Sequence, residues 1–207
     1  MMDWNARVGR MLFPNVRWRG DDAAMYLTFD DGPHPEATPA VLDVLSRYET
    51  KATFFLLGKS VRQFPVLVRR IADEGHTIGS HGFSHARFLF RTKSFVDREL
   101  TEAADEIQKA SGIVPLLFRP PHGHFDWRIP SLARSAGMST VLWSVSSRDY
   151  AARSSEEIFR RVTRRAEGGD VILMHDNERT KSTLPDALEQ ILSWGRQTNV
   201  PFAALNR

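Results

Sequence analysis

Short apolar runs rich in β-branched and aromatic residues alternate along the chain with longer segments in which apolar residues recur every three or four positions. The short runs are typical of buried strands, and the longer pattern is typical of amphipathic helices. Strands and helices in alternation predict a parallel sheet covered by helices. Seven strands are expected, over residues 25–29, 52–57, 76–80, 116–119, 139–145, 171–175 and 201–205.

The segments between these strands carry helical signals. Apolar residues from Val61 to Ile71 follow a helical period, and Ser154 stands three residues ahead of Glu157, as in a capping box. No internal repeat and no Pro/Gly/Ser-rich linker divides the chain, so we expect a single domain. The pattern alone leaves open whether the sheet closes into a barrel or stays open and doubly wound.

Composition and charge narrow the possible functions. The chain has 207 residues, of which 42% are hydrophobic and 26% charged, as in an ordinary globular domain. It contains no cysteine, which excludes disulfides, thiolate metal sites and a cysteine nucleophile. The net charge of +3 comes with arginines spread over helical segments, which we interpret as solvated faces and not as a nucleic-acid site. Examples are Arg69, Arg70, Arg160, Arg161, Arg164 and Arg165.

The apolar runs predict neither a membrane span nor a secretory leader. None approaches the roughly 18 residues that a transmembrane helix requires. The N-terminal sequence MMDWNARVGRMLFPNVRW places arginines and an asparagine where a leader peptide needs an unbroken apolar stretch. We therefore expect either a cytoplasmic protein or a trimmed form of an envelope or secreted protein, and the compartment stays open.

Residues that can carry chemistry gather where the predicted strands end. Because the carboxyl ends of parallel strands meet at one edge of a sheet or barrel, we expect these side chains to lie close together. They are Asp30 and Asp31 after the first strand, His81 and His85 after the third, Arg119 in the fourth, Asp149 after the fifth and His175 in the sixth.

Each of these signals has an ordinary structural explanation when it is taken alone. An Asp-Asp-Gly-Pro sequence after a strand is typical of a turn, and two histidines four residues apart are more often exposed than metal-binding. The combination favours a metal site, because two imidazoles and one carboxylate are a recurring ligand set for catalytic zinc. The set would be His81, His85 and either Asp30 or Asp31, and the remaining carboxylate would stand where a general base belongs.

Five short motifs follow one another along the chain. They are Thr28-Phe29-Asp30-Asp31-Gly32, His81-x-x-x-His85, Arg119-Pro120-Pro121-x-Gly123, Asp149-Tyr150 and Leu173-Met174-His175. Their order and intervals resemble those of the polysaccharide deacetylases of the NodB-homology type, carbohydrate esterase family 4. The resemblance runs from about residue 25 to the C-terminus. It implies an α/β fold, a distorted (β/α) barrel of about seven parallel strands in a single domain.

The resemblance also implies a domain layout and a role for each matching residue. Residues 25–207 would form the deacetylase domain, and residues 1–24 would be an N-terminal extension that packs on the barrel. The expected metal ligands are Asp31, His81 and His85. Asp30 resembles the base that deprotonates the metal-bound water, and Arg119 resembles the arginine that orients this base.

The remaining motif residues are expected to handle the substrate and the leaving group. His175 resembles the general acid that protonates the leaving amine, with Asp149 as its carboxylate partner. The backbone N–H of His122 would help to stabilise the oxyanion. Leu173 and Tyr150 would form the small apolar pocket for the acetyl methyl group.

Four positions depart from the usual pattern of the family. Gly82 stands where Ser or Thr is usual, so a hydroxyl that braces the metal loop is missing, and His122 stands where Tyr is usual. Ser146 replaces a frequent Asp, and Tyr150 replaces a frequent Trp. None of these changes removes a ligand, the base or the acid, so we expect them to affect substrate fit more than catalysis.

The resemblance implies a metal-dependent hydrolase that removes N-acetyl groups from N-acetylated amino sugars in a polysaccharide. Zinc is the expected metal, with cobalt and nickel as alternatives. The expected partner is the glycan itself, peptidoglycan or a chitin-like polymer, and the expected state is a monomer. Two alternatives stay open: an O-acetyl esterase or deacylase of a small intracellular amino-sugar conjugate, and a non-catalytic glycan-binding barrel.

The segment from Ala86 to Lys93 has no counterpart among the motifs and carries three large apolar residues. They are Phe88, Leu89 and Phe90. We expect them mainly to anchor the loop in the core, with stacking on sugar rings as the alternative.

Overall fold

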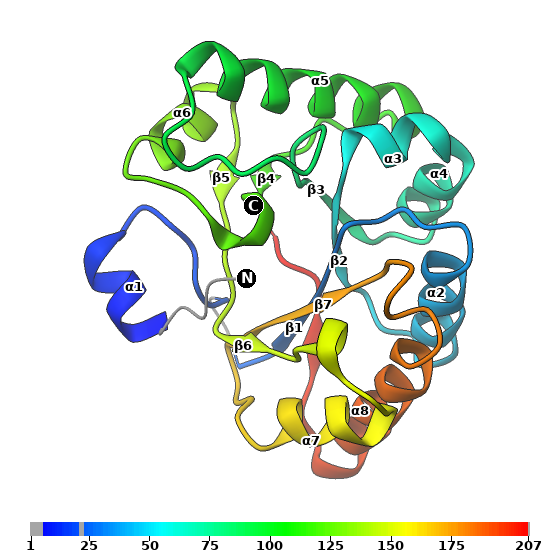
Figure 1. Ribbon diagram of the computed structural model, residues 1–207. Coiled ribbons are helices and arrows are strands. Elements are labelled where there is room, and N and C mark those ends of the chain that lie inside the picture. Colours follow the sequence, from blue (N-terminus) through cyan, green and yellow to red (C-terminus); the bar gives the residue numbers. More distant parts are fainter. Residues whose placement is uncertain (1–5, 21–22, 207) are drawn as a thin grey trace.

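The computed structural model describes residues 6–20 and 23–206, and its strands form one curled parallel sheet (Figure 1). The strands are β1 (Met25–Asp30), β2 (Thr53–Leu56), β3 (Thr77–Ser80), β4 (Leu117–Phe118), β5 (Ser139–Thr140), β6 (Val145–Ser146), β7 (Val171–His175) and β8 (Phe202–Ala203). Their order is β5-β4-β3-β2-β1-β7-β6, with β8 beside β1, and neighbouring strands run parallel. The predicted single-domain α/β barrel of about seven parallel strands is confirmed.

Helices cover the outside of the curled sheet, and α1 stands apart at one side (Figure 1). They are α1 (Ala6–Leu12), α2 (Ala37–Arg47), α3 (Gly58–Gln63), α4 (Pro65–Asp73), α5 (Lys93–Ser111), α6 (Ile129–Ser135), α7 (Ser155–Thr163) and α8 (Leu184–Thr198), with 3₁₀ turns η1 (Pro121–Gly123) and η2 (Asp149–Ala151). Among the described residues, no helix combines the length and the apolar character needed to cross a membrane.

Two cores form on the two faces of the sheet, because successive side chains of a strand point to opposite faces. In β1, Leu27 and Phe29 pack outward into the core shared with α2 and α8. Tyr26 packs into the inner core, and Thr28 and Asp30 bond an arginine there. This alternation delivers Asp30, the last residue of β1, to the interior at the carboxyl end of the barrel.

The prediction of one continuous strand over residues 139–145 is wrong, because the chain leaves the sheet after β5 and re-enters it as β6. β5 pairs with β4 and β6 pairs with β7, so the two strands lie at opposite ends of the strand order. Only residues 141–144 join them, which requires the two sheet edges to approach each other. The N-terminal segment lies between these two edges. Arg17 forms a parallel β-bridge with Val141, and the carbonyl of Arg17 accepts the N–H of Leu142.

Two of the expected helix signals can be compared with the structure. The period from Val61 to Ile71 belongs to two helices, α3 and α4, because Pro65 is incompatible with a helical Phe64 before it. The capping position of Ser154 is confirmed, since its side chain accepts the N–H of Glu157 at the start of α7. The amphipathic pattern therefore locates helical faces better than it locates helix ends.

Part of the expected N-terminal extension packs against the barrel. Val16 and Trp18 are buried among the residues of the inner core. Residues 1–5 and 21–22, which also belong to the expected extension, lie outside the described residues. The boundary between the extension and the domain stays a prediction.

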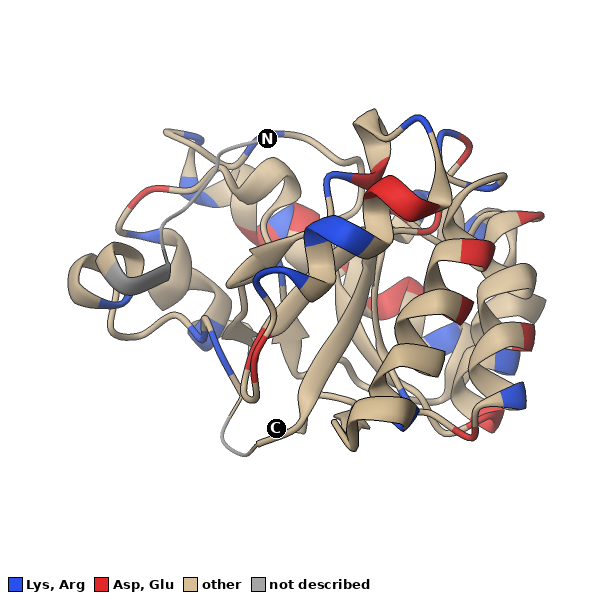
Figure 2. Cartoon of the chain, turned by 90° about the horizontal axis from the view of Figure 1, so that it is seen from below, with Lys and Arg blue, Asp and Glu red and all other residues tan. Residues whose placement is uncertain are grey.

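Charged residues lie on the outer helices, and several helices carry both signs (Figure 2). Arg70 illustrates this pattern, because its guanidinium lies 2.6 Å from Asp43 and 2.6 Å from Glu74. Exposed pairs of this kind contribute about 0–1 kcal/mol each to stability. Such pairs neutralise part of the arginine charge on these helices.

Candidate active site

A cavity of about 460 Å³ lies where β1 and β7 end, at the edge of the barrel at which the sequence predicts the chemistry. Seven residues predicted from the sequence line it: Asp30, Asp31, His81, His85, His122, Tyr150 and His175. Trp143, Asn177 and Arg179 line it as well, and sequence reasoning missed them. The structure therefore brings residues from separate parts of the chain into one cavity.

Two adjacent aspartates reach this cavity because the chain turns sharply after β1. In a continuing strand, Asp31 would point to the face opposite Asp30. Instead Asp31 adopts a left-handed backbone with a φ of 79°, and both carboxylates line the cavity. A left-handed backbone is costly for a residue with a Cβ and persists only where the surrounding structure holds it, which is common at active sites.

Asp31, His81 and His85 form a cluster with the geometry of a metal site. Their ligand atoms all lie within 4.8 Å of one another. The Asp31 Oδ1 atom lies 3.1 Å from His85 Nε2 and 3.7 Å from His81 Nε2. Ligands of a tetrahedral zinc ion at bond lengths of about 2.1 Å are separated by roughly 3.4 Å, so a cation fits between them without a large rearrangement.

Hydrogen bonding around the cluster also fits a cation. His81 donates its Nδ1–H to the carbonyl of Arg119 at 2.7 Å, which leaves Nε2 free to coordinate. Asn177 donates to Asp31 Oδ2 at 2.8 Å. The other oxygen, Oδ1, is buried and accepts no hydrogen bond from the described residues. A buried carboxylate oxygen without a donor is costly, and a cation at this point would satisfy it.

The protonation states favoured by this environment are those that metal ligands need. Burial raises the pKa of Asp31, but His85, His175 and His81 together hold it well below its usual range. Burial lowers the pKa of His81, which favours the neutral imidazole. A carboxylate and a neutral ring nitrogen are the forms that coordinate divalent metals.

The segment that carries the two histidines is a loop and not a helix. Gly82 has a φ of 77°, which only glycine adopts without strain, and its N–H donates to Ser80 Oγ at 3.2 Å. Glu99 of α5 accepts the N–H groups of Phe83 and Ser84 at 3.0 and 2.9 Å, and it accepts the Ser84 hydroxyl at 2.7 Å. Glu99 and Ser80 thus brace the loop that lacks a hydroxyl at position 82.

We expect Glu99→Ala to weaken this loop and, with it, metal binding. Three donors lose their acceptor, which should lower the free energy of unfolding by about 2–3 kcal/mol. Loss of a group that orients metal ligands typically costs about 10–100-fold in metal affinity. Urea unfolding and zinc titration check this result. Asp105→Ala, at an exposed site on the same helix, is the control. Equal metal affinity in the two variants would exclude a bracing role for Glu99.

Arg119 is fully buried inside the barrel and fixes the carboxylate of Asp30. Its Nη1 donates to Asp30 Oδ1 at 2.7 Å and to Thr28 Oγ1 at 2.8 Å. The other guanidinium nitrogens donate to the carbonyls of Val141 and Leu142 at 3.4 and 3.1 Å. Asp30 is therefore held by one oxygen, and its second oxygen, Oδ2, lies 3.7 Å from His81 Nε2 beside the metal cluster.

Asp149 holds His175 in one orientation. His175 donates its Nδ1–H to Asp149 Oδ1 at 2.8 Å, and its backbone N–H donates to Oδ2 at 2.6 Å. The Tyr150 N–H also donates to Oδ1, at 2.9 Å. Burial lowers the pKa of His175, but the Asp149 carboxylate and the more distant Asp31 and Asp30 raise it to about 9. The ring is therefore protonated at neutral pH and can act as an acid through Nε2.

Behind the turn that follows β1 lies the buried carboxyl group of Asp176, to which the sequence assigned no role. The Asp176 N–H donates to the carbonyl of Asp30, and its Oδ2 accepts the hydroxyl of Thr38 from α2. A Cβ at Gly32 would meet this carboxyl group, so only glycine fits there. Burial and the nearby Asp31 raise the pKa of Asp176 to about 8. The only sequence signal for Asp176 is its place directly after the sixth predicted strand.

The expected substrate residues occupy different environments. Tyr150 packs edge-on against His175, with ring centroids 5.7 Å apart. Leu173 is fully buried in the inner core and is not among the residues that line the cavity, where Trp143 adds an apolar wall instead. Burial and the nearby His85 and His81 lower the pKa of His122 to about 4, so its ring is neutral.

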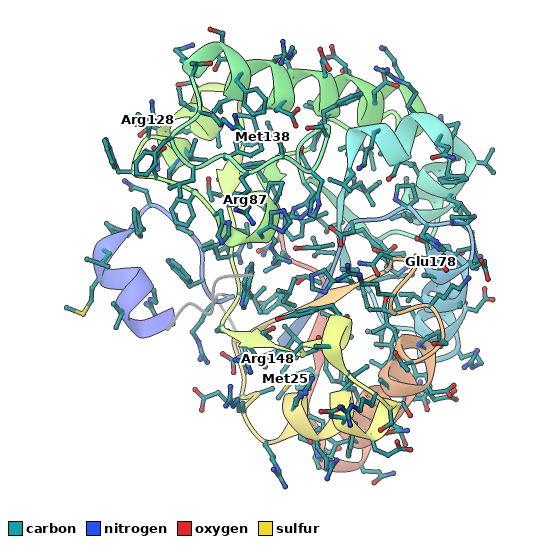
Figure 3. The ribbon with its side chains drawn as sticks, in the orientation of Figure 1. Met25, Arg87, Arg128, Met138, Arg148 and Glu178 are labelled. Carbon is teal, nitrogen blue, oxygen red and sulfur yellow. The ribbon has the colours of Figure 1, made fainter. Side chains whose placement is uncertain are left out.

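Residues from two other segments lie outside the cavity. His34 lies 3.0 Å from Glu178, which is labelled in Figure 3, and does not line the cavity. Phe88 is fully buried and anchors its loop, as expected, whereas Phe90 is 69% exposed. The loop from residue 86 to residue 93 is therefore only partly an anchor.

Comparison with known proteins matches this chain to polysaccharide deacetylases. The family model for polysaccharide deacetylase matches residues 19–141. A peptidoglycan-N-acetylglucosamine deacetylase of Bacillus cereus is 36% identical over 86% of this chain and 84% of its own length. A chitooligosaccharide deacetylase of Rhizobium leguminosarum bv. trifolii is 36% identical over 75% of this chain and 73% of its own length.

Comparison with solved structures also matches the chain to a deacetylase. A crystal structure of a peptidoglycan N-acetylglucosamine deacetylase superposes with a TM-score of 0.90 at 31% identity, covering 95% of this chain and 94% of that one. Some curated relatives are longer, and the chain spans 39% of the length of those from Listeria monocytogenes. The match therefore concerns the barrel domain with its cavity.

Proposed function

The chain belongs to the polysaccharide deacetylase family, whose members hydrolyse N-acetyl groups of glycans, and from this premise we propose that its cavity carries out that reaction with the residues assigned below. The observation that carries the proposal is the convergence of Asp30, Asp31, His81, His85 and His175 on one cavity. A barrel that only binds glycan would have no need of this set.

We propose that Asp30 acts as the general base and that Arg119 positions it. The guanidinium occupies one oxygen of Asp30, so the other oxygen stays available to accept a proton from the attacking water. Because Arg119 is itself held by two carbonyls and Thr28, Asp30 has little freedom to rotate away. Fixed geometry of this kind is what general-base catalysis requires.

We propose that His175 donates a proton to the departing amine, with Asp149 keeping it charged and oriented. An amide nitrogen is a poor leaving group unless it is protonated, so this step is needed for an N-acetyl substrate. The backbone N–H of His122 is assigned to the oxyanion. Tyr150 and Trp143 would form the apolar wall for the acetyl methyl group, and Leu173 would support this wall from the core.

Asp31, His81 and His85 would hold the metal ion, and we propose zinc, with cobalt or nickel as alternatives, because two imidazoles and one carboxylate suit these ions. When bound there, such an ion polarises the acetyl carbonyl and lowers the pKa of water. We further propose that residues 25–207 form the functional domain, that residues 1–24 are an extension packed on it, and that the protein acts as a monomer.

We expect a chelator to abolish acetate release and added Zn²⁺ or Co²⁺ to restore it. The physical reason is that the three ligand atoms lie close together, and the buried Oδ1 atom of Asp31 accepts no hydrogen bond from the described residues. The assay measures acetate released from chito-oligosaccharides and from peptidoglycan fragments, with the metal content determined on the same samples. Full activity in verified metal-free protein would contradict the proposal. Bound metal without acetate release from any glycan would favour a binding barrel.

A further inference from the structure

A second hollow, of about 320 Å³, lies beside α7 and is lined mainly by arginines. Its lining consists of Ser146, Arg148, Glu157, Arg160, Arg161, Arg164 and Arg165. Among the described residues, five arginines and one glutamate thus line this hollow. Like charges gathered in one place repel one another, so an anion bound beside the arginines that lack an acidic partner would be favoured.

The arginines share one face of α7 and its C-terminal extension. Positions 157, 160, 161, 164 and 165 are spaced by three and four residues, which places them on one side of a helix. Arg161 is held by Glu157 and by the carbonyl of Arg148. Arg164 and Arg165 are exposed and make no ion pair with any described residue. Their charges are therefore available to a ligand.

The hollow adjoins the catalytic cavity through one short segment of chain. Ser146 and Arg148 line the hollow, and Tyr150 lines the cavity. Two residues span at most roughly 7 Å, so the backbones of Arg148 and Tyr150 lie close together between the two hollows. Arg148, labelled in Figure 3 beside β6 and α7, has a left-handed backbone with a φ of 51°, a strained conformation at the junction of the two sites.

We propose that this hollow is an oxyanion subsite of the glycan-binding surface, which takes a carboxylate or phosphate group carried by the substrate polymer a short distance from the acetyl group being removed. The proposal rests on the proposed deacetylase function and adds a specificity element to it. It makes the preferred substrate an acidic glycan and a neutral chitin-like oligomer the poorer one.

The chemistry of the lining supports an oxyanion. Guanidinium groups offer paired N–H donors that match the two oxygens of a carboxylate or phosphate. Among the described residues, the lining includes no aromatic side chain on which the bases of a single-stranded nucleic acid could stack. Basic residues near the C-terminus of α7 also interact favourably with the helix dipole, but that effect does not require Arg148, which lies on another segment.

The test compares Arg164→Gln/Arg165→Gln with Arg69→Gln/Arg134→Gln, which removes the same charge from exposed sites on α4 and α6. Three substrates are used: a neutral N-acetylglucosamine tetramer, peptidoglycan strands with free peptide carboxylates, and strands that still carry a phosphodiester polymer. The readout is the ratio of kcat/KM for each acidic glycan to kcat/KM for the tetramer. Because both values come from one preparation, partial unfolding cancels.

We expect the ratio to fall about fivefold in Arg164→Gln/Arg165→Gln, mainly through KM, and to stay unchanged in the control, as for the loss of two exposed charge contacts. A fall only with the peptide-bearing strands identifies carboxylate as the ligand, and a larger fall with the phosphodiester-bearing strands identifies phosphate. An unchanged ratio, or an equal fall in the control, overturns the proposal.

Measuring the affinity for peptidoglycan strands tests the oxyanion subsite independently of the deacetylase function. If no glycan is deacetylated, the proposed function fails, while the affinity of the same peptidoglycan strands for the wild-type protein and both variants still tests the hollow. We expect the dissociation constant to rise about fivefold only in Arg164→Gln/Arg165→Gln. Loss of binding to a single-stranded DNA oligonucleotide, with glycan binding unchanged, would overturn the glycan subsite and indicate a nucleic-acid site instead.

Discussion

Asp30→Asn should keep its metal and lose turnover, whereas Asp31→Asn should lose its metal. The two residues are adjacent and chemically alike, but only the Asp31 carboxylate lies in the cluster with His81 and His85. Asp30 is instead paired with Arg119 at 2.7 Å. Loss of a general base typically slows the reaction by a factor of about 10²–10⁴. Acetate release and metal content, measured on the same dialysed samples, check the result.

The experiment needs a folding control, because Asp30 neutralises a fully buried guanidinium. Removing one partner of a buried ion pair costs about 3–5 kcal/mol, and asparagine keeps an oxygen for Arg119 but not the charge. Circular dichroism and urea unfolding therefore establish which fraction of each variant is folded, and metal content is expressed per folded protein. Equal metal retention in the two folded variants would mean that the roles of Asp30 and Asp31 are reversed.

This contrast also marks the limit of what the residues alone could predict. The positions of Asp30 and Asp31 after a strand indicated a shared site, but the spacing left open which of them joins the histidines. The left-handed backbone of Asp31 decides their placement, and it depends on the tertiary contacts of the turn. The resemblance to a family assigned the pair, and the geometry is consistent with that assignment.

Residues far from the motifs were beyond the reach of sequence reasoning. Glu99 lies in the middle of a long amphipathic helix, where a glutamate normally faces solvent, yet it is only 5% exposed and braces the histidine loop. Trp143 stands in an apolar run that reads as a strand interior. Its exit from the sheet follows from the closure of the barrel, in which β5 and β6 take opposite edges. Such features depend on non-local packing, which a local period does not encode.

The arginines of α7 give a further example. The scattered positions of the arginines indicated solvated helix faces. Arg70, with its two acidic partners, lies on such a face. Arg164 and Arg165 lie in the turn that follows α7 and have no acidic partner among the described residues. The fold also brings Ser146 and Arg148, from outside this helix, into the same hollow.

His175→Ala should reduce N-deacetylation far more than ester hydrolysis. An amine must be protonated to leave, so loss of the acid should cost a factor of about 10²–10⁴ on an N-acetyl substrate. The leaving group of 4-nitrophenyl acetate needs no proton, so its hydrolysis should change little. The ratio of the two activities, taken on one preparation, removes the effect of partial unfolding. An unchanged ratio would leave His175 as a structural histidine.

The pH dependence tests the same acid through its partner. With a pKa of about 9, His175 stays protonated through neutral pH, so kcat/KM should fall only as the pH rises through about 9. Asp149→Asn removes the charge that raises this pKa but leaves the ring buried. The alkaline limb of the profile of kcat/KM against pH should therefore move to lower pH by at least about one unit. Asp73→Asn, at an exposed site on α4, is the control and should leave the limb in place. If the limb stays near pH 9 in Asp149→Asn, the group that titrates there is not the Asp149-bound histidine, and the leaving-group acid must be sought elsewhere in the cavity.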